Sequence, residues 1–263
     1  MTIEFVDIGA ERLELLRLSP ERPGPTLVFL HEGLGSVAGW RDFPCTLCDR
    51  LAAPGLVYSR RGYGRSTPLG DARPTDYLHR EAWDVLPALL ARTGIERPML
   101  IGHSDGGSIA LLYAARFDPR AIAIMAPHVF VEDVTIAGIV EARKAWNEGK
   151  LRTPLARLHE DPDGAFFGWN DGWLSPAFRM WNIEGELPNI RCPVLAIQGY
   201  DDQYGTMEQL DRIARGAPHA VLLKLEHCGH APQRDQPERV VDAIGQLFAQ
   251  AGDTVQPIPP VPK

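Results

Sequence analysis

Six short apolar segments, separated by stretches with helical periodicity, constrain the fold of this chain more than any other feature. They lie at residues 26–30, 55–59, 98–102, 121–126, 193–199 and 220–225. Continuous apolar strands that alternate with helices are typical of a parallel sheet whose two faces are both covered. We therefore predict an α/β fold with a mostly parallel sheet and helices on both of its faces.

Two more segments with alternating polarity, 2–8 and 13–18, precede this series, and Gly9 and Ala10 lie near their turn. This pattern predicts a β-hairpin at the start of the chain. With 263 residues, the chain is long enough for one large α/β domain with a substantial core.

Residues 128–188 interrupt the alternation, because this segment is too long for a loop and contains no clear strand. It includes four of the six tryptophans, namely Trp146, Trp169, Trp173 and Trp181. A long insertion between strands is often a functional lid, although it can also be a helical decoration with its own small core. We predict a core of residues 1–127 and 189–251, a helical lid over 128–188 after the sixth strand, and an extended or disordered proline-rich tail over 252–263.

The strongest functional signal is Gly102-His103-Ser104-Asp105-Gly106, a G-x-S-x-G motif between a predicted strand and a predicted helix. This is the context in which the motif forms a tight turn that presents a nucleophilic serine. At the start of the helix, the dipole and free amides favour a developing oxyanion. The alternative is a serine that only caps the helix.

A serine hydroxyl needs a base to become a good nucleophile, and His230 is the strongest candidate because it follows the last predicted strand. His227 competes with it, although a surface or structural role suits His227 better. The base needs an acid that orients it. Asp202, just after the strand 193–199, is preferred over Asp201, and either aspartate could instead be a turn residue.

Five segments in this order, HEGLGS, RRGYGRS, GHSDGG, GYDD and CGHAPQRDQPE, resemble motifs of the α/β-hydrolase superfamily. The resemblance covers about residues 26–248 and points to the lid-bearing branch with esterases, enol-lactonases and meta-cleavage-product hydrolases. It implies the α/β-hydrolase fold, with nucleophile, acid and base in the order Ser104, Asp202, His230. It also implies an oxyanion hole from the amide of Asp105 and that of Gly33, with Leu34 as the alternative. Haloalkane dehalogenases and epoxide hydrolases are disfavoured, because they attack with an aspartate at the position of the serine.

Two positions depart from the family pattern. The family usually has His-Gly where this chain has His31-Glu32, and Asp-x-Arg-Gly where residues 59–62 are Ser-Arg-Arg-Gly. An acid is thus gained at one strand end and lost at the neighbouring one. We predict that Glu32 pairs with Arg60 or Arg61, or caps nearby amides, since a paired carboxylate tolerates burial. The competing hypothesis is that Glu32 faces the substrate as a second acid or base.

Further side chains are candidates for contact with substrate or for support of the site. The Asp105 side chain is predicted to cap the helix that it begins, with polarisation of substrate as the alternative. His103, Trp169, Trp173 and Trp181 are candidates for contacts with substrate or for loop support. In the insertion, Arg143, Arg152, Arg157 and Arg179 could hold a substrate carboxylate, but we expect most of them to be exposed.

These residues predict a serine hydrolase that cleaves a carboxylic ester or related acyl bond of a small, partly apolar or aromatic substrate. We expect no metal and no cofactor, since the histidines lack ligand spacing and no phosphate-binding loop is present. A C–C bond hydrolase or enol-lactonase would use the same residues, and thioester hydrolysis stays open. From another class, a non-catalytic ligand receptor on the same fold is the alternative.

Composition restricts the partners. The net charge is −7 and the lysines and arginines are scattered, which argues against nucleic acid as a partner. No apolar run approaches the roughly 18 residues of a membrane helix, and the first residues lack the basic character of a signal peptide, so we expect a cytoplasmic protein without membrane association.

Cys45 and Cys48, in an amphipathic helical pattern, are interpreted as packing thiols. The sequence does not indicate the oligomeric state.

Overall fold

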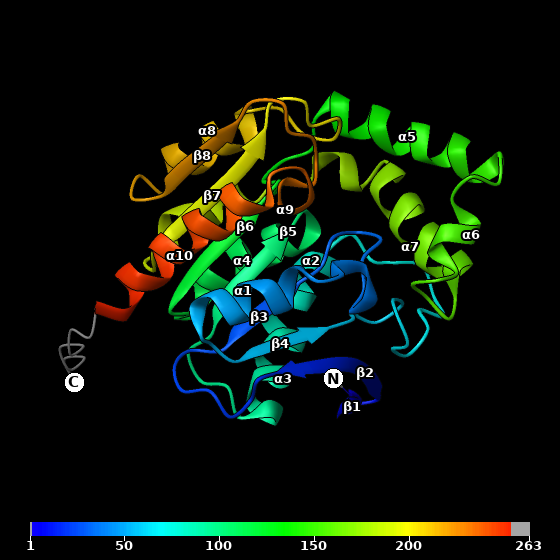
Figure 1. The fold of residues 1–263 in the computed structure, drawn as a ribbon. Helices are drawn as coiled ribbons and strands as arrows, with labels where there is room; N and C mark the ends of the chain where they lie inside the picture. Colours follow the sequence, from blue (N-terminus) through cyan, green and yellow to red (C-terminus); the bar gives the residue numbers. More distant parts are fainter. Residues whose placement is uncertain (1, 254–263) are drawn as a thin grey trace, which may run out of the picture.

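An eight-stranded sheet forms the centre of the computed structural model, which describes residues 2–253 (Figure 1). The strand order is β1-β2-β4-β3-β5-β6-β7-β8. The strands are β1 (Ile3–Ile8), β2 (Glu11–Leu18), β3 (Leu27–Leu30), β4 (Gly55–Tyr58), β5 (Met99–His103), β6 (Ala121–Met125), β7 (Val194–Gly199) and β8 (Val221–Leu225). The prediction of a hairpin followed by six apolar strands is therefore confirmed.

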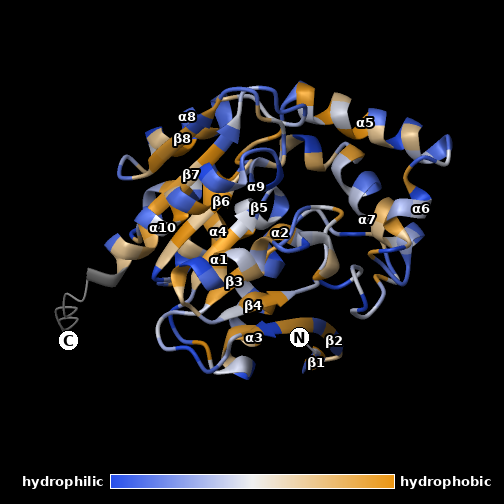
Figure 2. Ribbon diagram, viewed as in Figure 1, coloured by the Kyte–Doolittle hydropathy of each residue, from blue (hydrophilic) through white to orange (hydrophobic). Residues whose placement is uncertain are grey.

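The sheet is parallel from β4 to β8, while β1 pairs antiparallel with β2 and β2 with β4. Every residue of β3, β4, β5, β6 and β7 is buried, as continuous apolar strands require when both faces are covered. Figure 2 shows the same concentration of hydrophobic residues along the central strands.

Helices cover both faces of the sheet. On one face, α1 (Phe43–Leu51) and α10 (Pro237–Asp253) pack against Phe29 and Ile101. On the other face, α3 (Leu86–Thr93), α4 (Asp105–Arg116) and α8 (Glu208–Gly216) pack against Val28 and Leu100. The remaining short elements of the core are η1 (Ala38–Trp40), α2 (Tyr77–Arg80), η2 (Glu81–Val85) and α9 (Pro232–Asp235). Neighbouring residues of one strand thus serve opposite faces, as the pleat of a sheet dictates.

The insertion between β6 and β7 is helical and stands beyond the carboxyl ends of the strands (Figure 1). It contains α5 (Asp133–Asn147), α6 (Arg152–Leu155), α7 (Pro162–Leu174), η3 (Phe178–Met180) and η4 (Glu184–Asn189). Trp146 stacks on Phe166 with ring centres 4.2 Å apart, and Trp181 stacks on Phe178 at 5.5 Å. The insertion therefore has aromatic packing of its own.

Two of the predicted boundaries, the end of the insertion and the start of the tail, differ slightly from those in the structure. η4 ends at Asn189, one residue past the expected end of the insertion. α10 ends at Asp253, so the first two residues of the predicted tail belong to this helix. The rest of that tail, 254–263, lies outside the described residues.

Candidate active site

The G-x-S-x-G motif forms a sharp turn between β5 and α4. Ser104 has φ 52° and ψ −118°, a backbone conformation that residues other than glycine rarely adopt. A Cβ on Gly102 would lie 2.4 Å from the Gly106 carbonyl oxygen, and a Cβ on Gly106 would lie 1.9 Å from that of Leu30. Both glycines are therefore required by close backbone approach, and the turn holds Ser104 at the N-terminus of α4.

The structure brings Ser104, His230 and Asp202 together from three separate loops. His230 Nε2 lies 3.0 Å from Ser104 Oγ, and His230 Nδ1 lies 2.8 Å from both carboxylate oxygens of Asp202. The competing residues Asp201 and His227 are exposed. Of the alternatives that the sequence left open, Asp202 and His230 are the two that lie within hydrogen-bond distance of each other, with His230 also within reach of Ser104.

Asp202 is held in place by further donors. Gln198 Nε2 donates to Asp202 Oδ2 at 2.8 Å, and the Tyr204 amide donates to Oδ1 at 2.8 Å. Burial opposes ionisation of this carboxyl, but the hydrogen bond and charge of His230 outweigh burial and lower the pKa of Asp202. An ionised Asp202 fixes the proton on His230 Nδ1, which leaves Nε2 free to accept the proton of Ser104.

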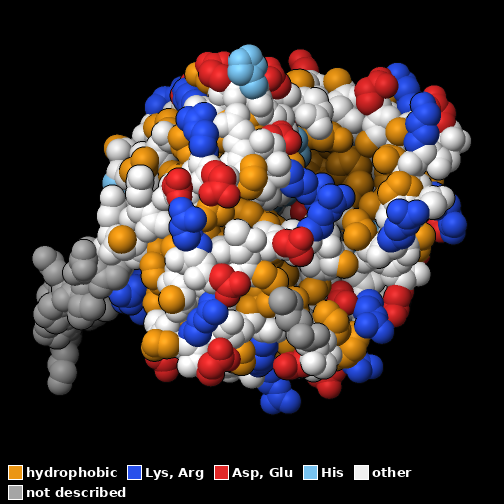
Figure 3. All heavy atoms as spheres, in the orientation of Figure 1, with side chains coloured by type: hydrophobic (Ala, Val, Ile, Leu, Met, Phe, Trp, Pro, Cys, Tyr) orange, Lys and Arg blue, Asp and Glu red, His pale blue; other side chains and the backbone are white. Residues whose placement is uncertain are grey.

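A cavity of about 110 Å³ opens beside Ser104. It is lined by Glu32, Gly33, Leu34, Ser104, Asp105, His128, Thr135, Ile139, Trp169, Trp173, Tyr204 and His230. Figure 3 shows a hollow with hydrophobic side chains between the helical insertion and the rest of the molecule. The residues predicted for the oxyanion hole, Asp105 and Gly33 with Leu34 as the alternative, thus border one cavity with the serine.

Two of the three tryptophans singled out in the insertion line this cavity. Trp169 lies so close to the loop after β3 that a Cβ on Gly33 would be 2.2 Å from its Nε1. Trp173 lies with its ring centre 5.1 Å from that of His128. Trp181 is not among the lining residues and instead packs against Phe178 and Trp173.

Glu32 was predicted to pair with Arg60 or Arg61 or to cap nearby amides, and the pairing of its carboxylate with either arginine is wrong. Glu32 Oε2 lies 3.4 Å from His103 Nδ1, and Oε1 lies 3.9 Å from Arg234 Nη2. Arg60 reaches only the Glu32 backbone carbonyl, at 2.9 Å. Burial opposes ionisation of Glu32, but the hydrogen bond and charge of His103 outweigh it and hold the pKa of this carboxyl well below its ordinary value.

His103 supports the site from outside the cavity. Its Nε2 donates to the His230 carbonyl oxygen at 2.7 Å, while Nδ1 faces Glu32 and lies 3.1 Å from Gln233 Nε2. The side chain is 3% exposed and does not line the cavity. His103 therefore links the loop of Glu32 to the loop of His230.

The family usually has an aspartate at the position of Ser59, and in this chain a glutamate of another strand brings a carboxylate to this place. Ser59 Oγ donates to Glu14 Oε2 at 2.7 Å, and the Arg65 amide donates to the same oxygen at 3.1 Å. Glu14 belongs to β2 and is buried. The sequence analysis missed this residue, because an antiparallel strand far away in the chain brings it to the end of β4.

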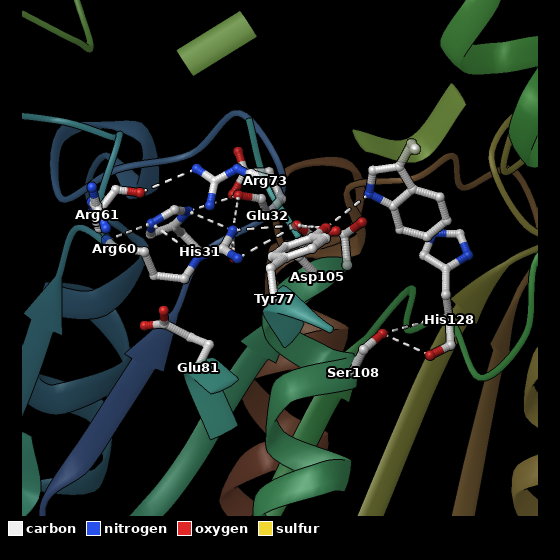
Figure 4. A network of polar contacts seen from close by, with 12 residues as sticks. His31, Glu32, Arg60, Arg61, Arg73, Tyr77, Glu81, Asp105, Ser108 and His128 are labelled. Carbon is white, nitrogen blue, oxygen red and sulfur yellow. Dashed lines mark hydrogen bonds and ion pairs between the residues drawn. The ribbon is translucent and has the colours of Figure 1, made fainter. Parts of the chain in front are cut away.

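Asp105 was predicted to cap α4 with its side chain, and this prediction is wrong. Its Oδ2 lies 3.4 Å from Arg60 Nη1 and accepts from the Tyr77 hydroxyl at 2.8 Å (Figure 4). The Tyr77 oxygen in turn accepts from Trp173 Nε1 at 3.0 Å. This series connects β4 to the insertion through the residue that follows Ser104.

Sequence reasoning also missed four residues that line the cavity: His128, Thr135, Ile139 and Tyr204. His128 is 2% exposed, and burial and the charge of His230 lower its pKa to about 4. Its position just past the carboxyl end of β6 was an available signal, since that edge of a parallel sheet collects site residues. Thr135 Oγ1 donates to the Tyr204 carbonyl oxygen at 2.6 Å, which ties α5 to the loop after Asp202.

The arginines of the insertion point to acidic partners or to solvent. Arg143 bonds Asn170 and Asp171, Arg152 bonds Asp163 at 2.6 Å, Arg179 bonds Asp133, and Arg157 is exposed. None of the four lines the cavity in the part of the chain that the structure describes.

The predicted CxxC lies on α1, where burial raises the pKa of Cys48 to about 12. Such a thiol is not poised for redox chemistry. Within residues 2–253, no helix is both long and apolar enough to cross a bilayer.

The chain belongs to the alpha/beta hydrolase family, because the model of this family matches residues 27–243. "Putative carbamate hydrolase RutD" of Pseudomonas savastanoi pv. phaseolicola is 26% identical over 80% of this chain and 89% of that protein. The 2-hydroxy-6-oxononadienedioate/2-hydroxy-6-oxononatrienedioate hydrolase of Paraburkholderia phymatum is 25% identical over 84% of this chain and 87% of that protein.

Among solved structures, the enol-lactonase from Burkholderia xenovorans LB400 superimposes with a TM-score of 0.74. It is 19% identical and matches 94% of this chain and all of that chain. At this identity the similarity concerns the fold alone.

Proposed function

We propose that the chain is a serine hydrolase that cleaves carboxylic esters or related acyl bonds of small substrates. The observation that carries this proposal is the position of His230, with Nε2 at 3.0 Å from Ser104 Oγ and Nδ1 at 2.8 Å from Asp202. Ser104 attacks the acyl carbon while His230 accepts its proton, and Asp202 stabilises the imidazolium that forms. Water then cleaves the acyl-enzyme, with His230 again as the base.

The oxyanion of each tetrahedral intermediate needs backbone donors beside Ser104. We assign this role to the amide of Asp105 and to that of Gly33, with Leu34 as the alternative. Asp105 is the first residue of α4, where an amide has no acceptor within the helix. In this proposal the helical insertion serves as a lid, and Trp169 and Trp173 bring apolar surface to the substrate.

Related chemistries use the same groups. Carbamate hydrolysis is supported by the relative named for it, which matches most of the chain. C–C bond cleavage and enol-lactone hydrolysis are supported by the relative and the solved structure that bear those names. A non-catalytic ligand receptor is the alternative from another class, and the distances around His230 weigh against it.

The proposal is tested with p-nitrophenyl esters, lactones, thioesters and carbamates, and with a fluorophosphonate that labels activated serines. We expect turnover and labelling of the purified chain. Ser104→Ala should lose labelling and about a thousandfold or more of the turnover, because it removes the nucleophile. If no substrate is cleaved and Ser104 is not labelled, the receptor alternative replaces the enzyme.

A further inference from the structure

Two acidic residues border the cavity, and its lining includes no lysine or arginine within the described residues. The acids are Glu32 and Asp105. Arg60 is buried and contacts Asp105, but it does not line the cavity. Arg234 approaches Glu32 only to 3.9 Å, and 44% of its side chain is exposed. The Asp105 side chain is 1% exposed and turns to Arg60, so Glu32, with 21% of its side chain exposed, is the carboxylate that faces the substrate. Its nearest partner, His103, does not line the cavity.

The other polar groups of the cavity do not reverse this balance. His128 is neutral at neutral pH, because burial and the nearby His230 lower its pKa to about 4. Asp105 Oδ1 and His128 Nδ1 are both buried without a hydrogen-bond partner among the described residues. The described lining thus contains the carboxylate of Glu32 and no fixed cation that could bind a substrate carboxylate.

No lysine or arginine of the insertion lines the cavity within the described residues. Arg143 and Arg179 lie on α5 and η3, but each forms an ion pair with an aspartate of the insertion. Neither of them lines the cavity.

We infer that this cavity selects neutral or positively charged acyl groups and rejects acyl groups that carry a carboxylate. The inference rests on the proposed function, because it concerns the acyl part of the substrate that Ser104 attacks. A cavity of about 110 Å³ is small, so a carboxylate on the bound acyl group would lie close to Glu32. An ammonium or N–H group would instead provide a donor for Glu32. Substrates with a carboxylate, such as ring-fission products and acidic enol-lactones, are disfavoured.

Two pairs of p-nitrophenyl esters with matched shapes test this selection. The hemisuccinyl and isocaproyl esters differ by a carboxylate in place of an isopropyl group. The β-alanyl and butanoyl esters differ by an ammonium in place of a methyl group. We expect kcat/KM for hemisuccinyl to be about tenfold or more below isocaproyl, because like charges in a confined site repel. The β-alanyl ester should match or exceed the butanoyl ester.

Glu32→Gln removes the carboxylate that faces the cavity with almost no change of shape. We expect it to narrow the hemisuccinyl–isocaproyl gap by about threefold or more, because the repulsion from Glu32 is lost. The ratio within one variant cancels any general loss of activity. Glu141→Gln is the matched control, since Glu141 lies on α5 near Ile139 and 68% of its side chain is exposed. It should leave the ratio unchanged.

Equal turnover of the hemisuccinyl and isocaproyl esters by the unmodified chain would overturn the inference and leave the proposed function intact. An unchanged ratio in Glu32→Gln would overturn it as well. If Glu32→Gln does not fold, the ratio measured on the unmodified chain decides alone. Absence of any ester turnover, with no labelling of Ser104, would remove the proposed function itself and the inference with it.

Discussion

Replacing Arg60 with methionine should destabilise the fold by about 3–5 kcal/mol, the usual cost of leaving a buried charge without its partner. Arg60 Nη1 lies 3.4 Å from Asp105 Oδ2, and each side chain is only 1% exposed. At this distance, with an effective dielectric constant of about 20, the attraction is worth about 5 kcal/mol. Methionine fills a similar volume but leaves the Asp105 carboxylate unpaired beside the site.

A double-mutant cycle separates charge from packing. Asp105→Asn keeps an oxygen that can accept from Tyr77, so Arg60→Met with Asp105→Asn should recover most of the lost stability. The free energy of unfolding is measured by urea denaturation with tryptophan fluorescence. Arg65→Met is the control, because Arg65 also lies 3.4 Å from its partner Glu160 but both side chains are exposed. It should cost at most about 1 kcal/mol.

The reasoning about Arg60 is refuted if Arg60→Met costs no more than Arg65→Met. It is also refuted if Asp105→Asn adds to the damage instead of relieving it. Either result would mean that the ion pair of Arg60 with Asp105 does not stabilise the fold. The charge pattern around the cavity would then need a different account.

Two further predictions concern the buried acid and the buried imidazole near the site. Ser59→Asp should lower the free energy of unfolding, measured by urea denaturation, by about 2–4 kcal/mol, because it places a second carboxylate beside Glu14. Adding Glu14→Gln should restore most of this loss. If Ser59→Asp is as stable as the unmodified chain, the proposed contact of Glu14 with residue 59 is wrong. The free energy of unfolding should fall as pH drops from about 6.5 to about 4. In this range the imidazole of His128 is protonated in the unfolded chain but stays neutral in the folded chain, where its pKa is about 4. His128→Phe should remove up to about 3 kcal/mol of this pH dependence, and identical slopes for the two proteins would show that His128 is not buried as a neutral group.

The comparison of Glu32 with Glu14 shows why the partners of buried carboxylates could not be predicted from the sequence. Glu32 stands where the family usually has glycine. The predicted sheet offered Arg60 and Arg61, at the end of the neighbouring strand, as its partners. The carboxylate instead turns toward His103 on β5, which lies on the other side of β3 from β4 in the sheet order. Which neighbouring strand end the Glu32 side chain faces is a matter of tertiary structure, and sequence spacing carries no information about it.

The backbone of the site could be predicted because its causes are local. Apolar runs of four to six residues form the buried strands, and Gly102 and Gly106 permit the turn at Ser104 because no Cβ fits there. Parallel strands place their carboxyl ends at one edge of the sheet, which is why Ser104, Asp202 and His230 could be expected together.

Only the tertiary structure decided which groups surround this arrangement. It brought Glu14 to Ser59 across 45 residues of sequence and placed Arg60 against Asp105 across another 45. It also brought His128, from the loop after β6, to the cavity wall. These contacts depend on strand register and on the packing of the insertion over the sheet. Local periodicity determines which face of an element is buried, but not which distant side chain it meets there.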